Sequence, residues 1–467
     1  MLLPAVTPAQ QARPVLAHIL NLQFAEARTL ARALNPPRSH YYESLADMLE
    51  LFVSEDPALF EAFKNRWESR LDELGKTPAA TSEKMYVLAE LRLQWAFVNL
   101  KFGHELQGAW HIRQSYLAAQ SCRQKYPHYE PIRKTWGTLN ILLGSVPEKY
   151  QWVLRMLNLR GSVESGLHEL LRSSRAADTY GTEARIIMAL AQSFLLEQHE
   201  AALAHLQETT QTSPGRLMWF LTSAIALKGG QAEKALVFLD SLLQPGVPCP
   251  ISYAYYLRGE TLLAAERYEE AAFAYRQFLE YYRGENFVKD AWFKAGICQA
   301  LMNNRQQAEA CFAKAQTQGS TLTEADRYAQ TRLNDSPWPH PVIARIRYAT
   351  DGGYYNRALE LARQHARDSF PSKKDSVEFL YRAARLYHRI NQTDTCLALY
   401  RITIEKAGQS PWYFAPNACL QAGFLLQQRR KYAEAEKFFK KALTYPSHPY
   451  KNSIDSKAKS ALERLKK

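Results

Sequence analysis

Two pairs of histidines come closest to a catalytic or metal-binding pattern. In "HEAALAH", His199 and His205 lie six positions apart, whereas the zinc ligands of H-E-x-x-H lie four apart on one helix face. In "HELQGAWH", His104 and His111 lie seven positions apart, a spacing that places both on one face of a helix. Solvated or capping histidines are the alternative for both pairs, and we predict no metal site.

Phosphate-binding and nucleophile motifs do not occur in the sequence. It contains no G-x-G-x-x-G, no G-x-x-x-x-G-K-[ST] and no G-x-S-x-G. Carboxylates are plentiful, but only the fold can pair them for acid–base chemistry. We predict a protein that is not an enzyme and binds no cofactor; the alternative is an enzyme whose pocket carries no recognisable motif.

The six cysteines form no C-x-x-C pair. Sparse, scattered cysteines are typical of small buried hydrophobic residues rather than of a disulfide framework. We therefore predict no disulfides among Cys122, Cys249, Cys298, Cys311, Cys396 and Cys419.

The net charge of +13 is concentrated near the C-terminal end. Residues 415–467 hold 12 Lys and Arg against 4 Asp and Glu, a net charge of +8. A hydrophobic content of 46% predicts a folded chain, and no apolar run is long enough to predict a transmembrane helix. No basic stripe interleaved with aromatic residues runs along the chain, so we predict no nucleic-acid binding.

The first residues, "MLLPAVTPAQQ", leave the compartment open. The apolar beginning and the small residues near Ala9 are similar to the end of an export signal, but no basic segment precedes them. An ordinary N-terminus is the alternative. We expect a periplasmic or exported protein if a longer signal has been lost, and a cytoplasmic protein otherwise.

A repeated helical pattern organises most of the chain. "LRGETLLAAERYEEAAFAYRQFL", "KAGICQALMNNRQQAEACFAKA" and "QAGFLLQQRRKYAEAEKFFKKAL" each place a glycine twelve positions before an alanine, with an aromatic residue four positions later. Weaker copies centre on Ala27, Ala202, Ala235, Ala358 and Cys396. Within the runs Ala202 to Ala308 and Ala358 to Ala435, successive copies are 33 to 39 residues apart, close to the period of about 34 residues of a helix–turn–helix repeat.

Each residue type in the pattern has an expected packing role. Glycine inside a helix costs about 1 kcal/mol against alanine, so we expect the glycines to let the second helix of a hairpin approach closely. The alanines would be their small partners, and the aromatic residues would fill the groove to the next repeat. The sets are Gly259, Gly296 and Gly423; Ala271, Ala308 and Ala435; and Tyr275, Phe312 and Phe439.

The pattern resembles the tetratricopeptide repeat over about residues 185–450, with one further copy near residues 12–36. The resemblance implies an all-α fold, a right-handed α-solenoid of antiparallel helix pairs. Residues 40–180 fit the repeat poorly, but their periodicity is still helical, and we predict long antiparallel helix pairs there without strands.

One segment, "GSVPEKYQWVLRMLNLRGSVESGL", has no copy elsewhere in the chain. Ser145 and Glu148 form an S-x-x-E capping box with Pro147 in the first turn, and Gly161 is the expected left-handed residue that ends the helix. Tyr150, Val153, Leu154 and Leu157 lie on one face, and Trp152 and Met156 on a second. A helix that is apolar on two faces predicts a buried wedge, and a partner- or lipid-facing helix is the alternative.

The wider stretch, "KTWGTLNILLGSVPEKYQWVLRMLNLRGSVESGL", resembles the helical family that includes the fungal inclusion-body clearance protein and vertebrate tetratricopeptide-repeat protein 39. The shared positions are Gly137, Gly144 or Ser145, Pro147, Gly161, Gly166 and Leu167. The flanking "LRLQWAFVNLKFGHELQGAWHIRQSY" and "LELFVSEDPALFEAF" are more similar to bacterial members, which are often expected to be exported. The resemblance implies a helical repeat scaffold with no catalytic residues to carry over.

These observations predict three parts. Residues 1–180 form an N-terminal helical region with one repeat-like hairpin and the wedge at 144–170. Residues 181–450 form the repeat array. Residues 451–467 form a basic capping helix, with Ile454, Ala458, Ala461 and Leu465 on its apolar stripe.

We predict a scaffold that binds a protein or peptide in the concave face of the solenoid. In tetratricopeptide repeats the first helix of each pair lines that face, and aromatic and arginine residues often anchor interfaces. Packing between helices is the alternative role for each residue. A peripheral membrane protein that uses the basic end is the alternative function, and no oligomeric state is indicated. The predicted partner-binding residues are Tyr253, Tyr256, Glu260, Phe293, Tyr381, Arg385, His388 and Gln427.

Overall fold

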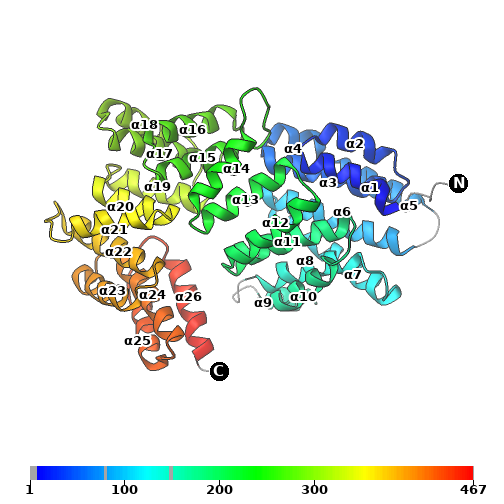
Figure 1. Ribbon diagram of the computed structural model, residues 1–467. Helices are drawn as coiled ribbons and strands as arrows, with labels where there is room; N and C mark the ends of the chain where they lie inside the picture. Colours follow the sequence, from blue (N-terminus) through cyan, green and yellow to red (C-terminus); the bar gives the residue numbers. More distant parts are fainter. Residues whose placement is uncertain (1–7, 78–80, 147–150, 466–467) are drawn as a thin grey trace. The chain divides into compact units, whose positions relative to one another are not determined.

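The computed structural model describes residues 8–77, 81–146 and 151–465. Within these ranges all regular secondary structure is helical, from α1 to α26, and neighbouring helices pair antiparallel (Figure 1). The predicted all-α solenoid of helix pairs is confirmed. The first seven residues, which carry most of the stretch that left the compartment open, lie outside the described residues.

Packing divides the chain into two compact units. The first unit comprises Met1–Gly229, Glu233–Leu257 and Glu280–Gly284, and the second comprises Gly230–Ala232, Arg258–Leu279 and Glu285–Lys467. The predicted division near residue 180 concerned repeat content along the sequence, and it stays a prediction.

The first unit holds α1 (Pro8–Leu20), α2 (Phe24–Arg32), α3 (Arg38–Ser54), α4 (Pro57–Phe63), α5 (Arg66–Lys76), α6 (Ser82–Lys101), α7 (Glu105–Lys125), α8 (Ile132–Gly144), α9 (Gln151–Met156), α10 (Val163–Ser173), α11 (Thr179–Leu195), α12 (His199–Thr212), α13 (Arg216–Lys228) and most of α14 (Ala232–Leu242). The residues of α15 (Tyr253–Ala264) and α16 (Tyr268–Tyr281) are divided between the two units.

The second unit continues with α17 (Val288–Leu301), α18 (Arg305–Thr317), α19 (Glu324–Asp335), α20 (Pro341–Gly352), α21 (Tyr355–Gln364), α22 (Lys373–Arg389), α23 (Thr393–Ala407), α24 (Phe414–Gln428), α25 (Tyr432–Leu443) and α26 (Lys451–Leu465).

The hairpins share one turn geometry. In each of nine hairpins, a residue between the two helices has a positive φ, between 58° and 88°. In most of them the next backbone N–H bonds to a carbonyl five residues earlier, as in Arg267 to Leu262 at 2.9 Å and Lys431 to Leu426 at 2.8 Å. Such a bond satisfies a carbonyl that the end of the first helix leaves free. The turn residues are Leu22, Gly103, Glu197, Gly230, Glu266, Asn303, Gly353, Asn391 and Arg430.

A small buried residue follows each turn residue by five positions. The five weaker copies predicted from the sequence, at Ala27, Ala202, Ala235, Ala358 and Cys396, all occupy this position and are fully buried. Gly108 of α7 occupies it too, in a hairpin that the sequence pattern did not reveal. The turn geometry therefore extends the repeat into the predicted irregular region, where α6 and α7 pair as predicted.

The aromatic residues pack inside their own hairpins. A Cβ on Gly296 would lie 2.5 Å from the Phe312 ring, and one on Gly259 would lie 2.7 Å from the Tyr275 ring. Phe312 also reaches Trp338, beyond α19, with ring centroids 5.5 Å apart, so the prediction that these rings fill the groove to the next repeat stays a prediction beside this contact inside the hairpin. The contact inside the hairpin has a geometric reason: each ring lies one helical turn beyond the small alanine, directly opposite the glycine, where the missing Cβ leaves room for it.

In other hairpins, side-chain size is balanced between the first-helix position that holds the glycine and the second-helix position, sixteen residues later, that holds the ring. Where the first-helix residue is larger, the residue sixteen positions later is small, as with Ile346 and Ala362, or Val15 and Ala31. All four side chains are buried. A fixed interhelical distance accommodates one large and one small side chain, because protein interiors tolerate neither voids nor overlap.

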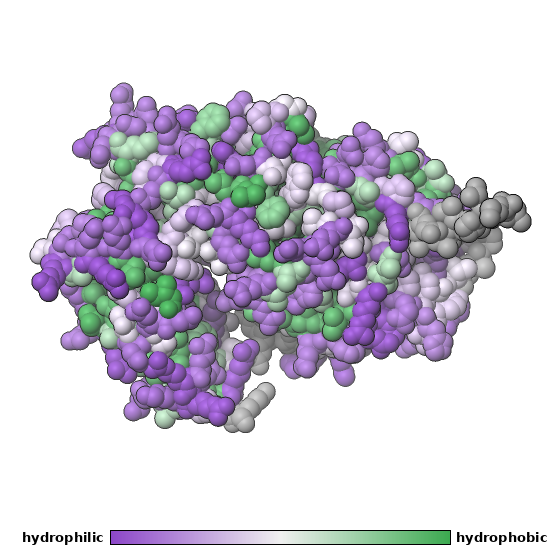
Figure 2. All heavy atoms as spheres, viewed as in Figure 1, coloured by the Kyte–Doolittle hydropathy of each residue, from purple (hydrophilic) through white to green (hydrophobic). Residues whose placement is uncertain are grey.

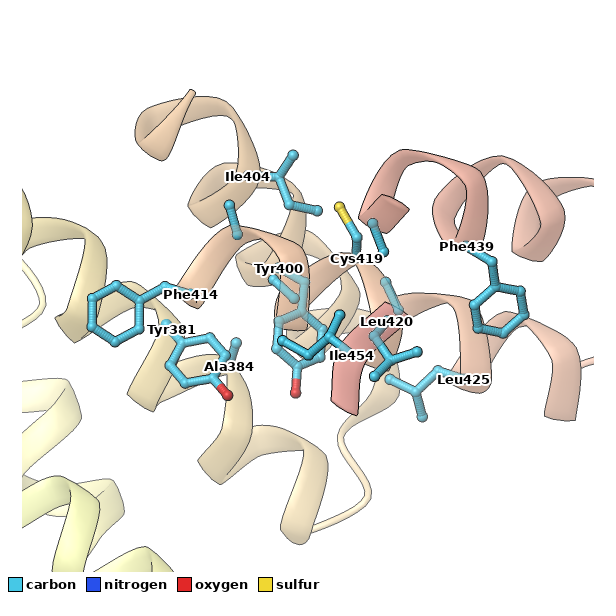
Figure 3. Packing of buried hydrophobic residues seen from close by; sticks show 14 of the residues in the cluster. Tyr381, Ala384, Tyr400, Ile404, Phe414, Cys419, Leu420, Leu425, Phe439 and Ile454 are labelled. Atoms are coloured by element: carbon cyan, nitrogen blue, oxygen red, sulfur yellow. The ribbon is translucent and has the colours of Figure 1, made fainter. Parts of the chain in front are cut away.

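The first helices of successive hairpins form a layer in the second unit. Helix α17 contacts α19; further along the chain, α20 contacts α22, α22 contacts α24, and α24 contacts α26. We call these helices the first-helix layer. Beneath it, Tyr381, Tyr400, Phe414, Phe439 and Ile454 belong to one buried cluster (Figure 3).

The α20–α21 hairpin is also tied to the turn that follows α15. Glu266 of that turn pairs with Arg345 at 2.7 Å and with Arg357 at 3.4 Å. These bridges join residues 79 and 91 positions apart in the sequence. They fix the orientation of α20 within the second unit.

Helix α9 differs from the predicted wedge. Trp152 is 57% exposed and Met156 is 67% exposed, so the face that carries them is not buried. The prediction of a helix buried on both faces is wrong for these two residues. Pro147, Glu148, Lys149 and Tyr150 lie outside the described residues.

The two predicted ends of this segment have different outcomes. Ser145 follows the last residue of α8, and its hydroxyl donates to the Ile141 carbonyl oxygen at 2.7 Å. The predicted capping box includes Pro147 and Glu148, so it lies partly outside the described residues. The left-handed residue after α9 is Asn158, not Gly161. Gly161 is instead a close-approach position, because its Cβ would lie 2.7 Å from the Asn140 carbonyl oxygen of α8.

The rest of the segment packs as an element of the first unit. Ser162 caps α10 by accepting a hydrogen bond from the Ser165 N–H at 3.3 Å. A Cβ on Gly137 of α8 would lie 2.9 Å from the Gly166 carbonyl oxygen of α10, so the two glycines allow these helices to touch. Helix α10 therefore docks on α8, although Trp152 and Met156 of α9 are exposed.

Two further predictions are confirmed. Ile454, Ala458 and Ala461 of α26 are buried, and Leu465 packs partly against the same cluster. All six cysteines are free, and Cys122, Cys298, Cys396 and Cys419 are buried.

Candidate partner-binding site

The predicted partner-binding residues fall in both units. Tyr253 and Tyr256 begin α15 in the first unit, where their rings stack with centroids 5.2 Å apart. The other six residues lie in the second unit, so each group is described separately.

Three of the predicted residues are buried. Tyr256 is 3% exposed, Phe293 is 2% exposed, and Tyr381 is fully buried. The Tyr381 hydroxyl accepts a hydrogen bond from Asn417 at 2.8 Å, and its ring faces Phe414 across the cluster (Figure 3). These side chains hold helices together and leave no surface for a partner.

Glu260 is committed to a local ionic network. Lys294 bridges Glu260 at 2.7 Å and Asp290 at 2.8 Å, and the Tyr275 hydroxyl donates to Glu260. This network joins α15, α16 and α17 across the same hairpins whose glycines admit aromatic rings. With two carboxylates and one ammonium group it carries an excess negative charge, and it links the helices at the start of the second unit.

An arginine cluster occupies the first-helix layer. We use this name for Arg347 of α20 and for Arg382 and Arg385 of α22. Arg347 and Arg385 hold the same place in successive hairpins, six positions before the turn residue. Their helices touch, so the repeat brings two guanidinium groups from the same position to one surface.

Aromatic side chains hold Arg347 and Arg382 in place. The Arg347 guanidinium lies 4.5 Å from the Tyr328 ring centroid and donates to the Tyr328 hydroxyl. Arg382 donates to the Tyr413 hydroxyl at 2.8 Å. Cation–π contacts and hydroxyl acceptors fix the guanidinium planes before any partner arrives.

The three arginines differ in how many of their N–H donors have hydrogen-bond partners. Arg382 is 6% exposed and donates two bonds to Glu378, at 3.1 Å and 2.7 Å. The Nε atom of Arg347 is buried without a hydrogen-bond partner. Among the described residues, Arg385 makes no hydrogen bond, and its ion pair with Asp351 spans 3.6 Å.

Positive charge dominates the cluster. Burial raises the pKa of Glu378, but the neighbouring Arg382 and Arg332 charges outweigh burial and lower that pKa overall, so Glu378 is ionised and compensates Arg382. Burial, together with the charges of Arg385 and Arg389, lowers the pKa of His388. His388 is therefore neutral near pH 7, and the free positive charge resides on the guanidinium groups.

His388 and Gln427 complete the predicted set. Both are half-buried, on α22 and α24 respectively. The Nδ1 atom of His388 lies 3.3 Å from the Tyr400 hydroxyl. These two side chains and Arg385 are the predicted residues of the second unit that are partly exposed and outside the Glu260 network.

Sequence reasoning missed Arg347, Arg382, Tyr328 and Tyr413. The predicted residues follow from superposing the first helices on their small residues Gly259, Gly296, Ala384 and Gly423. The equivalent residue of α20 is Ile346, which is large. The rule used for the other hairpins took the residue directly after a small first-helix residue. Taking instead the residue six positions before the turn residue, here Gly353, identifies Arg347.

The first unit holds a different ionic network, fully enclosed. The Lys134 ammonium group lies 2.7 Å from Glu183 and 3.0 Å from Glu90, and it donates to the Tyr41 hydroxyl at 2.7 Å. Two carboxylates and one ammonium leave an excess negative charge. Burial, followed by the nearby Glu90 charge, raises the pKa of Glu183 despite Lys134.

Neither histidine pair is arranged as a metal site. His111 packs edge-on against Trp67, and His104 stacks on Phe60. No group of three or more His, Cys, Asp or Glu side chains could hold a metal ion in the described parts of the chain. Among the same residues, no helix is both long and apolar enough to cross a bilayer.

Comparison with known families decides the nature of the repeat. The tetratricopeptide repeat model matches residues 252–284 and 416–448. These two segments are therefore similar to the tetratricopeptide repeat. The first segment contains all of α15 and α16, and the second contains α25 with most of α24, so two hairpins of the common turn geometry match the family model.

Solved structures of tetratricopeptide proteins align along most of the chain. An IFIT1 monomeric mutant with m7Gppp-AAAA is 11% identical, with a TM-score of 0.37, over 93% of this chain and 94% of that one. Yeast Tom70 is 12% identical, with a TM-score of 0.30, over 98% and 96%. Cut9–Hcn1 of the APC/C is 13% identical, with a TM-score of 0.28, over 99% and 91%. A search of curated proteins found no match.

Proposed function

We propose that the protein is a non-enzymatic scaffold that binds a protein or peptide segment on the first-helix layer of the second unit. We propose that this layer is the concave face expected from the sequence. Tetratricopeptide repeats generally act as protein-interaction modules, and this chain contains two segments that match the family.

The observation that carries the proposal is the state of the arginine cluster. Arg347 and Arg385 are 21% and 32% exposed, and both retain donors that no neighbour uses. A charged donor that is left without a partner near the protein interior is costly. A partner segment that supplies acceptors would satisfy both residues.

The partner itself is first identified by affinity purification from native cells with mass spectrometry. A photocrosslinking residue is then placed at His388 or Gln427, and the purified partner is added. Matched controls carry it at Glu405 of α23 or Lys440 of α25, which are exposed on second helices. Crosslinks from positions 388 and 427 but not from 405 and 440 support the proposal. Crosslinks from the control positions alone contradict it.

A peripheral membrane role remains the alternative. The apolar stripe of α26 is buried, but Lys457 and Lys459 are exposed on its outer face. Salt-sensitive flotation with anionic vesicles that disappears without residues 446–467 would favour this role. Kinship with the inclusion-body clearance and tetratricopeptide-repeat protein 39 family, including its bacterial and exported members, likewise stays a proposal.

A further inference from the structure

The charges around the arginine cluster do not balance. Glu378 is nearly buried and is used by Arg382 through two hydrogen bonds. This leaves Asp351 as the carboxylate opposite both Arg347 and Arg385, at 3.9 Å and 3.6 Å. Charge-assisted hydrogen bonds are normally about 2.7–2.9 Å long, so Asp351 attracts the two guanidinium groups without saturating them.

Asp351 is also the most exposed member of this group. Its side chain is 48% exposed, whereas those of Arg347 and Arg385 are 21% and 32% exposed. An exposed carboxylate in a loose ion pair contributes little to stability, because water competes for both ions. Asp351 is therefore readily displaced by a better-placed acceptor.

Neighbouring side chains already restrict the guanidinium groups of the arginine cluster. Tyr328 fixes Arg347 through its ring and its hydroxyl, and the buried Arg382–Glu378 pair borders Arg385 on α22. A guanidinium that is already ordered loses little side-chain entropy on binding. Its planar donors match a carboxylate in two-point geometry.

At the position six residues before the turn, an arginine occurs in two hairpins of the second unit. The residue six positions before the turn is Arg347 and Arg385 in these two, but Glu260, Ile297 and Phe424 in three neighbouring hairpins. A nucleic-acid backbone needs basic contacts spread along a track, one for each of several phosphates. A carboxylate or two, flanked by apolar residues, fits the observed confinement better.

We propose that the first-helix layer of the second unit recognises an acidic segment of its protein partner, whose Asp or Glu carboxylates bind Arg347 and Arg385 in place of Asp351. This inference rests on the proposed function and names the chemistry of the partner. It assigns Asp351 the role of an internal competitor for the same two arginines.

The test measures the fluorescence anisotropy of labelled peptides with the full-length protein. The probes are a peptide of alternating Glu and Ala, its counterpart with Gln in place of Glu, a Lys counterpart, and a short single-stranded RNA. We expect the Glu peptide to bind and the Gln and Lys peptides to bind at least about tenfold more weakly, with the difference from Gln falling as salt is raised.

Three variants define the site. Arg385→Gln and Arg347→Gln are each expected to weaken binding of the Glu peptide by about tenfold, since each removes a charge-assisted contact. Asp351→Asn is expected to strengthen binding, an outcome that a merely misfolded variant would not produce. Arg363→Gln, an exposed arginine of α21, is the matched control and should bind as the wild type does.

Two outcomes overturn the inference. One is equal binding of the Glu and Gln peptides, and the other is preferential binding of the RNA. If the partner crosslinks at positions 388 and 427 while charge has no effect, the scaffold function stands and the acidic partner is wrong. If the partner does not crosslink at positions 388 and 427 and the Glu peptide is not preferred, both proposals fail.

Discussion

The ring of Phe439 occupies the space that a side chain on Gly423 would need. A Cβ added to Gly423 would lie 2.5 Å from the Phe439 Cε1 atom, closer than real side chains approach one another. The two residues lie on α24 and α25 of one hairpin, and Phe439 is fully buried. The glycine is therefore required by the ring opposite it, and this relationship gives a direct test of the repeat packing.

We predict that Gly423→Ala lowers the unfolding free energy by about 1–3 kcal/mol, because overpacking a core costs about that much. Adding Phe439→Leu should recover part of the loss, since the smaller side chain leaves room for the methyl group. Urea unfolding measures both values. Gly75→Ala is the control: nothing lies within 4 Å of its Cβ, so α5 should gain helix propensity. Additive losses in the double variant would contradict the pairing.

The enclosed network of the first unit gives a second prediction. Lys134→Met leaves Glu90 and Glu183 without their cation, and breaking a buried pair in this way costs about 3–5 kcal/mol. Arg155→Met, at an exposed position on α9, is the control and should leave the unfolding free energy nearly unchanged. Equal stability of the two variants would mean that the network contributes nothing.

The same network predicts a pH dependence. The pKa of Glu183 is raised in the folded state by burial and by Glu90, so the folded protein binds this proton more tightly than the unfolded chain. The resulting stabilisation is present below the usual carboxyl pKa of 4.5 and is lost as the pH rises through the raised pKa. Glu183→Gln should flatten this part of the stability curve, whereas Glu164→Gln, exposed on α10, should not. Parallel curves for Glu183→Gln and the wild type would exclude the effect.

Two tryptophans test the corrected position of α9. Trp152 is 57% exposed and Trp95 is 1% exposed. Trp152→Ala should change the unfolding free energy by less than about 0.5 kcal/mol, while Trp95→Ala should lower it by about 3–5 kcal/mol. Thermal or urea unfolding provides the comparison. A large loss from Trp152→Ala would restore the buried wedge.

Local chemistry made much of the fold predictable. The small residue after each turn is chosen by close helix packing, so Ala27, Ala202 and Cys396 marked hairpins even where the rest of the pattern was weak. The placement of Phe312 was not predictable in the same way. Its ring could have filled the groove to the next repeat, the space over Gly296 or both, and only the backbone positions of α17 and α18 place it over Gly296.

The residues of the candidate site were likewise predictable only where a small residue marked the register of the helix. Arg385 was found because Ala384, a small residue, set the register of α22. Arg347 was missed because Ile346 breaks the small-residue rule, and the complementary Ala362 lies sixteen positions away. Burial was likewise invisible in the sequence: Tyr381 belongs to a helical stripe that points inward, and the sequence pattern alone did not distinguish a packed tyrosine from a binding one.

The most direct measurement of the account is a comparative affinity purification from native cells. The wild-type protein, the Arg347→Gln/Arg385→Gln double variant and the Arg363→Gln control are recovered, and their bound proteins are quantified by mass spectrometry. The account predicts that a specific partner with an acidic segment is recovered with the wild type and the control, and is lost from the folded double variant. Recovery of the same partner in equal amount with all three proteins would contradict it.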